Sequence, residues 1–137
     1  MAKFVATDYE ITLAGDDFSD AIAAVTFDIT VAEQEVTAFG DTFVQRIGGL
    51  KDASISLDFH QDFGASAVDA TLHPLLGQTV EIVVKPTSGA VSATNPSYTG
   101  TFLVTEYSPF ASSIGDLATL SVSFPLASGT VVRGDGS

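Results

Sequence analysis

The sequence predicts a mainly β protein: an antiparallel β-sandwich or small β-barrel with one short flanking α-helix (about Ser66–His73) and a long inter-strand arm. Three observations support this. Apolar and polar residues alternate with a period of two over long stretches. Gly and Pro residues mark the ends of these stretches. A single segment has helical spacing instead.

The clearest alternation covers residues 25–31 and 53–62. Apolar side chains occupy one face of each predicted strand, and hydroxyl or carboxyl side chains occupy the other, as in a sheet with one buried face. The polar positions are Thr26, Asp28, Thr30, Ser54, Ser56 and Asp58. Residues 117–124 repeat the pattern, and residues 9–13, 80–84 and 98–107 are further strand-like runs rich in β-branched and aromatic residues.

The helical segment follows the second long strand. Ser66 and Asp69 have the spacing of a capping box, and apolar residues at helical spacing come next. Because Pro74 disfavours the α conformation in His73, and Gly77 is a typical stop, we expect about two turns ending near His73.

Length and composition limit the class of protein. The 137 residues are expected to form a single domain over residues 1–137, with a flexible Gly-rich tail from about residue 133. The net charge of −12 and the five scattered bases argue against conventional nucleic-acid binding. Cysteine is absent, so disulfides and thiolate chemistry are excluded.

The charged fraction of 16% is low for a small monomer and fits a subunit whose surface is partly interface. The alternative is an apolar monomer with a surface rich in Ser and Thr. No apolar run is long enough to cross a bilayer, and Asp8 interrupts the N-terminus before a signal-peptide core develops. We therefore expect no membrane anchor and synthesis in the cytoplasm.

Residues 35–51 form the predicted arm. This segment is too apolar for a freely solvated loop and too rich in Gly for a core strand. Packing against another subunit accounts for both properties, and packing back onto its own domain is the alternative. The candidate contact residues are Val36, Phe39, Gly40, Asp41, Thr42, Phe43, Arg46 and Ile47.

Four features occur in a particular order: Phe39-Gly40-Asp41-Thr42, then Gly49-Leu50-Lys51-Asp52 before an alternating strand, then the short helix before Gly77, and finally Gly115-Asp116-Leu117. In this combination the chain resembles the major tail tube proteins of siphophages, over nearly its whole length. The resemblance implies hexameric rings joined through a continuous inner sheet and stacked into a long non-contractile tube, the conduit for DNA ejection.

The resemblance also implies that the arm reaches the next ring, that tape measure and tail terminator or tip proteins are partners, and that the protein resides in the virion tail after assembly in the host cytoplasm. An acidic, hydroxyl-rich wall would let DNA pass without specific binding, because negative potential holds phosphates away. We expect the polar face from Thr26 to Asp58 to be that wall.

A few residues allow other functions. Asp58, His60 and Asp62 alternate along one predicted strand and could bind a metal, as in a metal-dependent enzyme, but polar residues on the wet side of a strand are far more common. Arg133-Gly134-Asp135 spells an adhesion tripeptide, so a surface-displayed β-sandwich binding module, using this tripeptide or the loop at residues 86–96, is the alternative function. We predict no catalytic residue, no metal and no cofactor.

Overall fold

A computed structural model describes residues 8–65 and 67–135 of the chain. In this part of the chain, seven strands form one antiparallel sheet in the order β2-β1-β5-β6-β7-β4-β3. The strands are β1 (Glu10–Leu13), β2 (Asp16–Asp17), β3 (Ile22–Glu35), β4 (Arg46–His60), β5 (Thr79–Lys85), β6 (Ser97–Leu103) and β7 (Thr119–Gly134), with a 3₁₀ helix η1 (Ser19–Ala21) and one α-helix α1 (Val68–Leu75). The predicted mainly antiparallel β fold with one short helix is confirmed.

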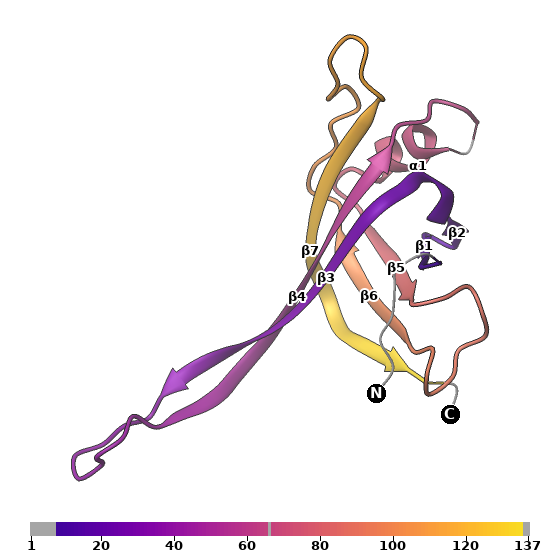
Figure 1. The fold of residues 1–137 in the computed structure, drawn as a ribbon. Helices are drawn as coiled ribbons and strands as arrows, with labels where there is room; N and C mark the ends of the chain where they lie inside the picture. The colour runs from indigo at the N-terminus through magenta and orange to yellow at the C-terminus, as the bar shows by residue number, and fades with distance from the viewer. Residues whose placement is uncertain (1–7, 66, 136–137) are drawn as a thin grey trace.

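The sheet folds over on itself at β7. The first half of this strand pairs with β4, up to Pro125 opposite Ser54, and the second half pairs with β6, from Leu126 opposite Phe102. Pro125 has no N–H to donate and lies where the partner changes. The result is two facing layers that share one bent strand, as Figure 1 shows.

The core fills the space between the two layers. Alternate residues of β4 and β7 point inward, and α1 closes one end of the core with two apolar side chains. Phe102 of β6 meets Phe27 of β3 edge to face, with ring centroids 5.5 Å apart. The largest fully buried side chains are Phe59, Phe102, Phe124, Leu13, Ile55, Leu57, Leu72, Ile82, Val68 and Val104.

The helix ends later than predicted. It runs to Leu75, so Pro74 lies inside its last turn rather than beyond its end. A proline so close to the C-terminus removes one hydrogen bond and is tolerated because the helix stops one residue later. Gly77 takes a φ of 80° there, and its N–H donates to the carbonyl of Val104 at 2.9 Å.

The predicted capping box falls on a residue for which the structure gives no description. Ser66 lies outside the described residues, and Ala67 is the N-cap, without a side-chain hydrogen bond. The carboxylate of Asp69 instead accepts a hydrogen bond from the hydroxyl of Tyr107 at 2.6 Å. Gln61 donates to the same hydroxyl at 3.1 Å. This network ties α1 to the end of β4 and to the loop that follows β6.

The hydrogen bonds of Tyr107 should contribute to stability in a way that depends on pH. Burial, followed by the hydrogen bond to Asp69, raises the pKa of Tyr107 above its usual value of 10.0. The neutral phenol therefore stabilises the fold below pH 10, and this contribution is lost as the pH rises through the raised pKa. We expect Tyr107→Phe to cost about 1–2 kcal/mol at pH 7. The variant should also lose less stability than the wild type in denaturant melts above pH 10.

The matched control is Tyr98→Phe. No residue in the described part of the chain makes a hydrogen bond to the Tyr98 hydroxyl, so this change should alter stability at pH 7 far less than Tyr107→Phe does. Equal costs for the two variants would contradict the role given to the network.

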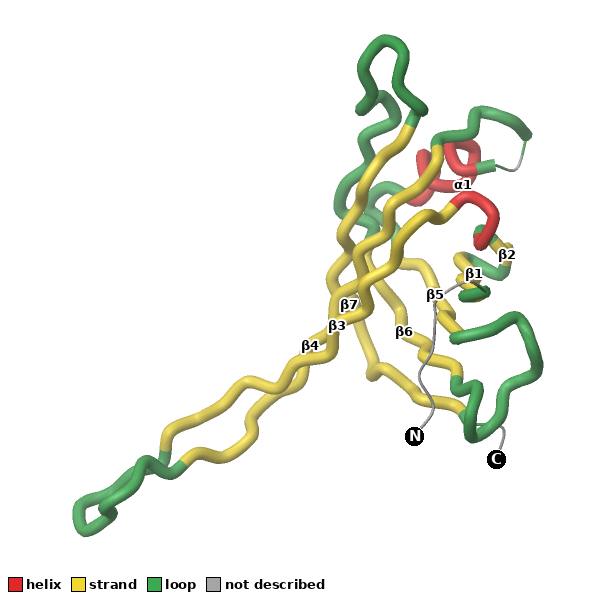
Figure 2. The backbone as a smooth tube through the Cα atoms, in the orientation of Figure 1, coloured by secondary structure: helices red, strands yellow, loops and turns green. Residues whose placement is uncertain are grey.

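Strands β3 and β4 form a hairpin that leaves the body of the protein. They pair from Ile22 opposite Phe59 to Glu35 opposite Arg46. Every residue from 28 to 52 is exposed, and we call residues 29–52 the projecting hairpin. Figure 1 and Figure 2 show it extending away from both layers. At about 3.3 Å per residue, its strands carry the connecting loop roughly 20 Å beyond the body.

The C-terminal strand is also longer than predicted. Arg133 pairs with Tyr98 and Gly134 with Ser97, so these two residues belong to β7 and not to a tail. Residues 136 and 137 lie outside the described residues. Among the described residues, no helix has the length and apolarity needed to cross a bilayer.

Candidate assembly surfaces

The outer face of the β3-β4-β7 layer is polar. Thr26 lies opposite Ser56, and Asp28 lies opposite Ser54, while inward-facing neighbours such as Ile55 build the core. The structure therefore brings five predicted wall residues together, from Thr26 to Asp58, on one face. Thr30 pairs with Asp52 further out, within the projecting hairpin.

Sequence reasoning missed the third strand of this face. Ser121 of β7 lies opposite Asp58 and donates a hydrogen bond to its carboxylate at 2.7 Å. Ser123 lies opposite Ser56, with their hydroxyl oxygens 3.3 Å apart. The alternation of hydroxyl residues from 119 to 123 was visible, but the pairing partner of that strand was not. The face is thus a ladder of short hydroxyls with two carboxylates.

Strand β3 leaves one long edge of the sheet open. It is the last strand in the sheet order, so one side of its backbone has no strand partner among the described residues. It is 14 residues long and contains neither Pro nor Lys, the residues that commonly block such edges. An open edge of this length is a template for pairing with another chain.

The opposite edge of the same layer is partly blocked. Leu103 ends β6, so the first half of β7 lacks a neighbouring strand on that side. Two side chains take the place of the missing strand. Glu106 accepts a hydrogen bond from the Ser123 N–H at 2.8 Å, and the Thr105 hydroxyl donates to the Ser123 carbonyl at 3.4 Å. Both side chains are exposed and can be displaced by an incoming strand.

The projecting hairpin carries apolar side chains that are largely exposed. Phe39, Phe43 and Leu50 are each at least 80% exposed, and Ile29, Val31 and Ile47 are about half exposed. Packing back onto the chain's own domain is therefore not observed. An exposed apolar surface of this kind is typical of an interaction site.

The tip of the hairpin is nevertheless a turn held by its own hydrogen bonds. The Ala38 N–H donates to the Asp41 carboxylate at 2.8 Å, and the Gln45 N–H donates to the Thr37 hydroxyl at 2.9 Å. Gly40 has a φ of 97°, which other residues rarely adopt. These local bonds present the Phe39 ring outward without support from the body.

The predicted arm residues all lie in this hairpin. Val36, Phe39, Gly40, Asp41, Thr42 and Phe43 are in its connecting loop, and Arg46 and Ile47 begin β4. Arg46 forms an ion pair with Glu33 across the hairpin, with 3.3 Å between Nε and Oε1. The prediction placed the start of the arm too late, because residues 29–34 form its other strand.

The suggested metal ligands do not converge. Asp58 is bonded to Ser121, and Asp62 accepts a hydrogen bond from the Gly64 N–H at 2.9 Å. The Nδ1 of His60 is buried without a hydrogen-bond partner. Over residues 8–65 and 67–135, no group of three or more His, Asp or Glu side chains is placed to hold a metal ion.

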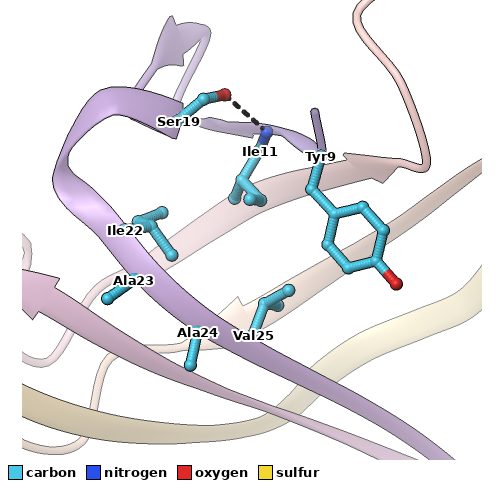
Figure 3. Close-up of a pocket in the computed structure, with 7 residues that line it drawn as sticks. All are labelled: Tyr9, Ile11, Ser19, Ile22, Ala23, Ala24 and Val25. Carbon is cyan, nitrogen blue, oxygen red and sulfur yellow. Dashed lines mark hydrogen bonds between the residues drawn. The ribbon is translucent and has the colours of Figure 1, made fainter. Parts of the chain in front are cut away.

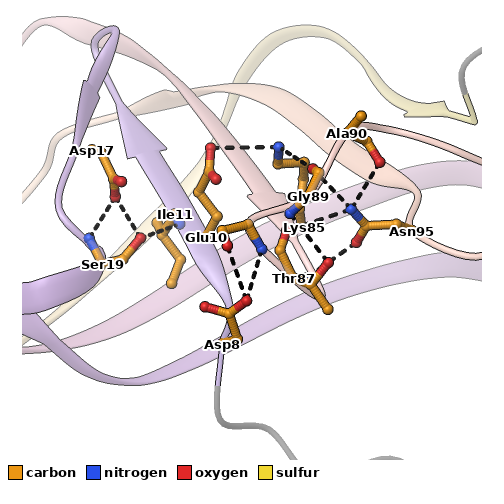
Figure 4. Close-up of polar contacts among 11 residues, drawn as sticks. Asp8, Glu10, Ile11, Asp17, Ser19, Lys85, Thr87, Gly89, Ala90 and Asn95 are labelled. Carbon is orange, nitrogen blue, oxygen red and sulfur yellow. Dashed lines mark hydrogen bonds and ion pairs between the residues drawn. The ribbon is translucent and has the colours of Figure 1, made fainter.

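The loop at residues 86–96 is held to the body by polar contacts (Figure 4). Buried Asn95 donates to the carbonyls of Gly89 and Ala90 at 3.0 and 3.1 Å, and Asp8 accepts from the Ser88 hydroxyl at 3.0 Å. Lys85 reaches both Gly89 and Glu10. The ordered backbone leaves Ser92 and Thr94 exposed, whereas the Arg133-Gly134 pair lies in a strand.

Two grooves run beside β3 where the two layers separate. One, of about 390 Å³, is lined by Phe27, Ile29, Val84 and Tyr98. The other, of about 370 Å³, lies between β1 and β3 and includes Ala23 and Ala24 (Figure 3). Its Ser19 hydroxyl already accepts the Ile11 N–H at 3.0 Å. Neither groove has a charged lining residue.

Together these features define a class: a folded-over antiparallel sheet with a polar outer face, an open edge and a projecting apolar hairpin. Comparison with protein-family models finds no match, and comparison with curated protein sequences finds none either. The fold, however, is found in solved structures.

The chain is similar to a chain in the virion of a native gene transfer agent particle, with a TM-score of 0.72 and 20% identity over 92% of this chain and 95% of that chain. It is also similar to a chain in the tail of an empty gene transfer agent particle with C6 symmetry, with a TM-score of 0.64 and 18% identity over 82% of this chain and 81% of that chain. These likenesses show that the chain shares its fold with chains in the virion and the tail of gene transfer agent particles.

Proposed function

We propose that this protein is the structural subunit of a long non-contractile phage-type tail tube, located in the virion tail. Six-membered rings stack to form the tube, and DNA passes through it during ejection. One observation carries the proposal: the likeness to the gene transfer agent virion chain covers 92% of this chain and 95% of the other, so the whole fold is shared. The C6 symmetry of the second neighbour supports the six-fold ring.

The two edges of the β3-β4-β7 layer supply a way to close the ring. If β3 of one copy pairs with the first half of β7 in the next, the layers join into one continuous sheet. The ladder of hydroxyls with Asp28 and Asp58 then lines the lumen. Such a wall repels phosphate and offers a passing duplex no apolar contact.

The proposal assigns the protein no catalytic step, metal or cofactor. Its partners are other copies of the chain, a tape measure protein inside the tube, and terminator and tip proteins at its ends. Negative-stain microscopy of purified protein at rising concentration tests the assembly. Rings or tubes are expected, and a monomer at all concentrations would instead favour a binding module that uses the ordered loop at residues 86–96.

The lumen assignment predicts the effect of reversing its charge. Asp28→Lys combined with Asp58→Lys should permit tube assembly but make the tubes retain duplex DNA at low salt and slow its ejection. Each lysine that reaches a phosphate releases counterions, so log K should fall with log salt by about 0.9 per contact. DNA co-sedimentation with tubes over a salt series measures this directly.

The control is Asp16→Lys combined with Asp20→Lys, which reverses two exposed acids outside the polar face. This variant should not capture DNA inside tubes. Equal DNA retention by both variants, or none by the first, would remove Asp28 and Asp58 from the wall and leave tube formation untouched.

A further inference from the structure

The free edge of β7 is covered by the loop that precedes this strand. Residues 104–118 connect β6 to β7, and residues 105–112 of this loop form neither helix nor strand. We call residues 105–112 the edge strap. Figure 2 shows the loop running beside the first half of β7. The side chains of Thr105, Glu106 and Ser112 are exposed on the strap, so core packing does not hold them in place.

These three side chains bond to the backbone of β7. The Glu106 carboxylate accepts a hydrogen bond from the Ser123 N–H at 2.8 Å, and the Thr105 hydroxyl donates to the Ser123 carbonyl at 3.4 Å. The Ser112 hydroxyl accepts a hydrogen bond from the Thr119 N–H at 3.2 Å. The backbone groups of every second residue in a strand point to the same side, so Thr119 and Ser123 both face the edge away from β4. The strap therefore fills bonding positions that a partner strand would use.

The strap holds β7 through side chains alone. Among the described residues, no backbone–backbone hydrogen bond joins residues 105–112 to β7. Uncovering the edge therefore breaks three side-chain hydrogen bonds and disrupts no strand pairing.

Pairing of another strand with this edge excludes the bonds of the strap. A backbone N–H has one proton to donate, so Ser123 cannot serve Glu106 and the carbonyl of an incoming strand at the same time. An incoming strand would also lie about 4.8 Å from β7, in the space that the side chains of the strap occupy. The other edge of this layer, at β3, is open. Covering an edge is one way in which proteins prevent edge-to-edge association.

The strand that fits this edge is β3 of a second copy. Both β3 and β7 run antiparallel to β4, so they run in the same direction. A rotation about a tube axis keeps the direction of each strand along that axis and the face that is turned toward it. In a ring, β3 of one copy therefore meets β7 of the next in parallel, with the polar faces of both copies on one side.

We propose that the edge strap is an autoinhibitory contact, which β3 of a second copy displaces when the ring closes. In the free subunit, Thr105, Glu106 and Ser112 satisfy the edge of β7. Each contact in the ring must break these bonds, so the strap raises the concentration at which subunits assemble. This inference rests on the proposed tube and adds the control of its assembly.

The critical concentration of assembly tests the strap. Purified wild type is compared, by sedimentation over a concentration series, with Glu106→Ala and with the triple variant Thr105→Val, Glu106→Ala, Ser112→Ala. Glu106→Gln is the matched control, because the amide removes the negative charge and keeps an acceptor for the Ser123 N–H. Asp116→Ala removes an acid from the same loop outside the strap. Circular dichroism checks that each variant is folded.

Glu106→Ala should lower the critical concentration roughly three- to tenfold, as expected when a competing hydrogen bond is lost. The triple variant should lower it further, whereas Glu106→Gln and Asp116→Ala should stay close to the wild type. Equal decreases in Glu106→Ala and Asp116→Ala would show that charge repulsion alone sets the critical concentration, and would overturn the strap.

Amide hydrogen exchange gives a second readout, which does not depend on assembly. Below the critical concentration, the Ser123 amide should exchange roughly three- to tenfold faster in Glu106→Ala than in the wild type, and Glu106→Gln should restore the protection. In tubes, wild type and Glu106→Ala should protect Ser123 equally, because β3 of the neighbouring copy then supplies the acceptor. Unchanged exchange in free Glu106→Ala subunits would contradict the proposal.

The strap and the tube fail in different ways. Wild-type tubes, with the same critical concentration in every variant, would overturn the strap and leave the tube standing. Wild-type protein that forms neither rings nor tubes at any concentration would overturn the proposed function, and the strap with it.

Discussion

Replacing residues 33–48 with the dipeptide Asn-Gly is expected to yield a folded protein that no longer forms tubes. Ala32 and Gly49 lie side by side in the hairpin, since a Cβ on Gly49 would be 3.2 Å from the Ala32 carbonyl oxygen. A two-residue Asn-Gly turn can therefore close the shortened hairpin. Every removed residue is exposed, so core packing should be unaffected.

The expected loss is of stacking, not of folding. The melting temperature of the shortened protein should stay close to that of the wild type, while negative-stain images should show single rings or monomers. The matched control is Val132→Ser, which removes an exposed apolar side chain from β7 and should leave tubes intact. Long tubes formed by the shortened protein would show that the hairpin is not the stacking element.

Phe102→Ala is expected to have the largest effect on folding. Phe102 is fully buried where β6 faces the other layer, and it packs edge to face against Phe27. Truncating a buried Phe to Ala leaves a cavity and typically costs about 3–5 kcal/mol. A domain of this size has a free energy of unfolding of only about 5–15 kcal/mol. The variant should therefore lose much of its stability at 37 °C.

The matched control is Phe110→Ala, which removes the same ring from an exposed position. Its cost should stay within about 0.5 kcal/mol, as is usual for surface changes. Chemical denaturation of both variants below the concentration of assembly measures the difference. Similar costs would contradict the placement of the core between the two layers.

The sequence predicted those strands in which one face meets the core. Ile55, Leu57 and Phe59 alternate with polar residues because the core takes every second side chain of β4. The same strand continues outward through Gly48 and Gly49, where backbone pairing rather than burial holds it. Without burial there is no alternation to detect, so the hairpin was expected as an irregular arm.

Local sequence patterns did not predict the structure where tertiary contacts determine it. Pro74 is accommodated inside α1 because the backbone is held immediately after the helix, where the Gly77 N–H donates a hydrogen bond to the Val104 carbonyl. Ser121 and Ser123 join the polar face only through pairing with β4, which no local pattern encodes. The stacked rings of Phe63 and Phe110 were missed for a similar reason, since the two residues are far apart in sequence and meet in space.

We propose that copies of this chain form a six-fold tube lined by the polar face of the β3-β4-β7 layer. A cryo-electron microscopy map of tubes grown from purified protein tests it most directly. We expect six subunits per ring, with Asp28 and Asp58 facing the lumen and the projecting hairpin crossing to the next ring. A map with these aspartates on the outer surface, or a protein that stays monomeric at every concentration, would contradict it.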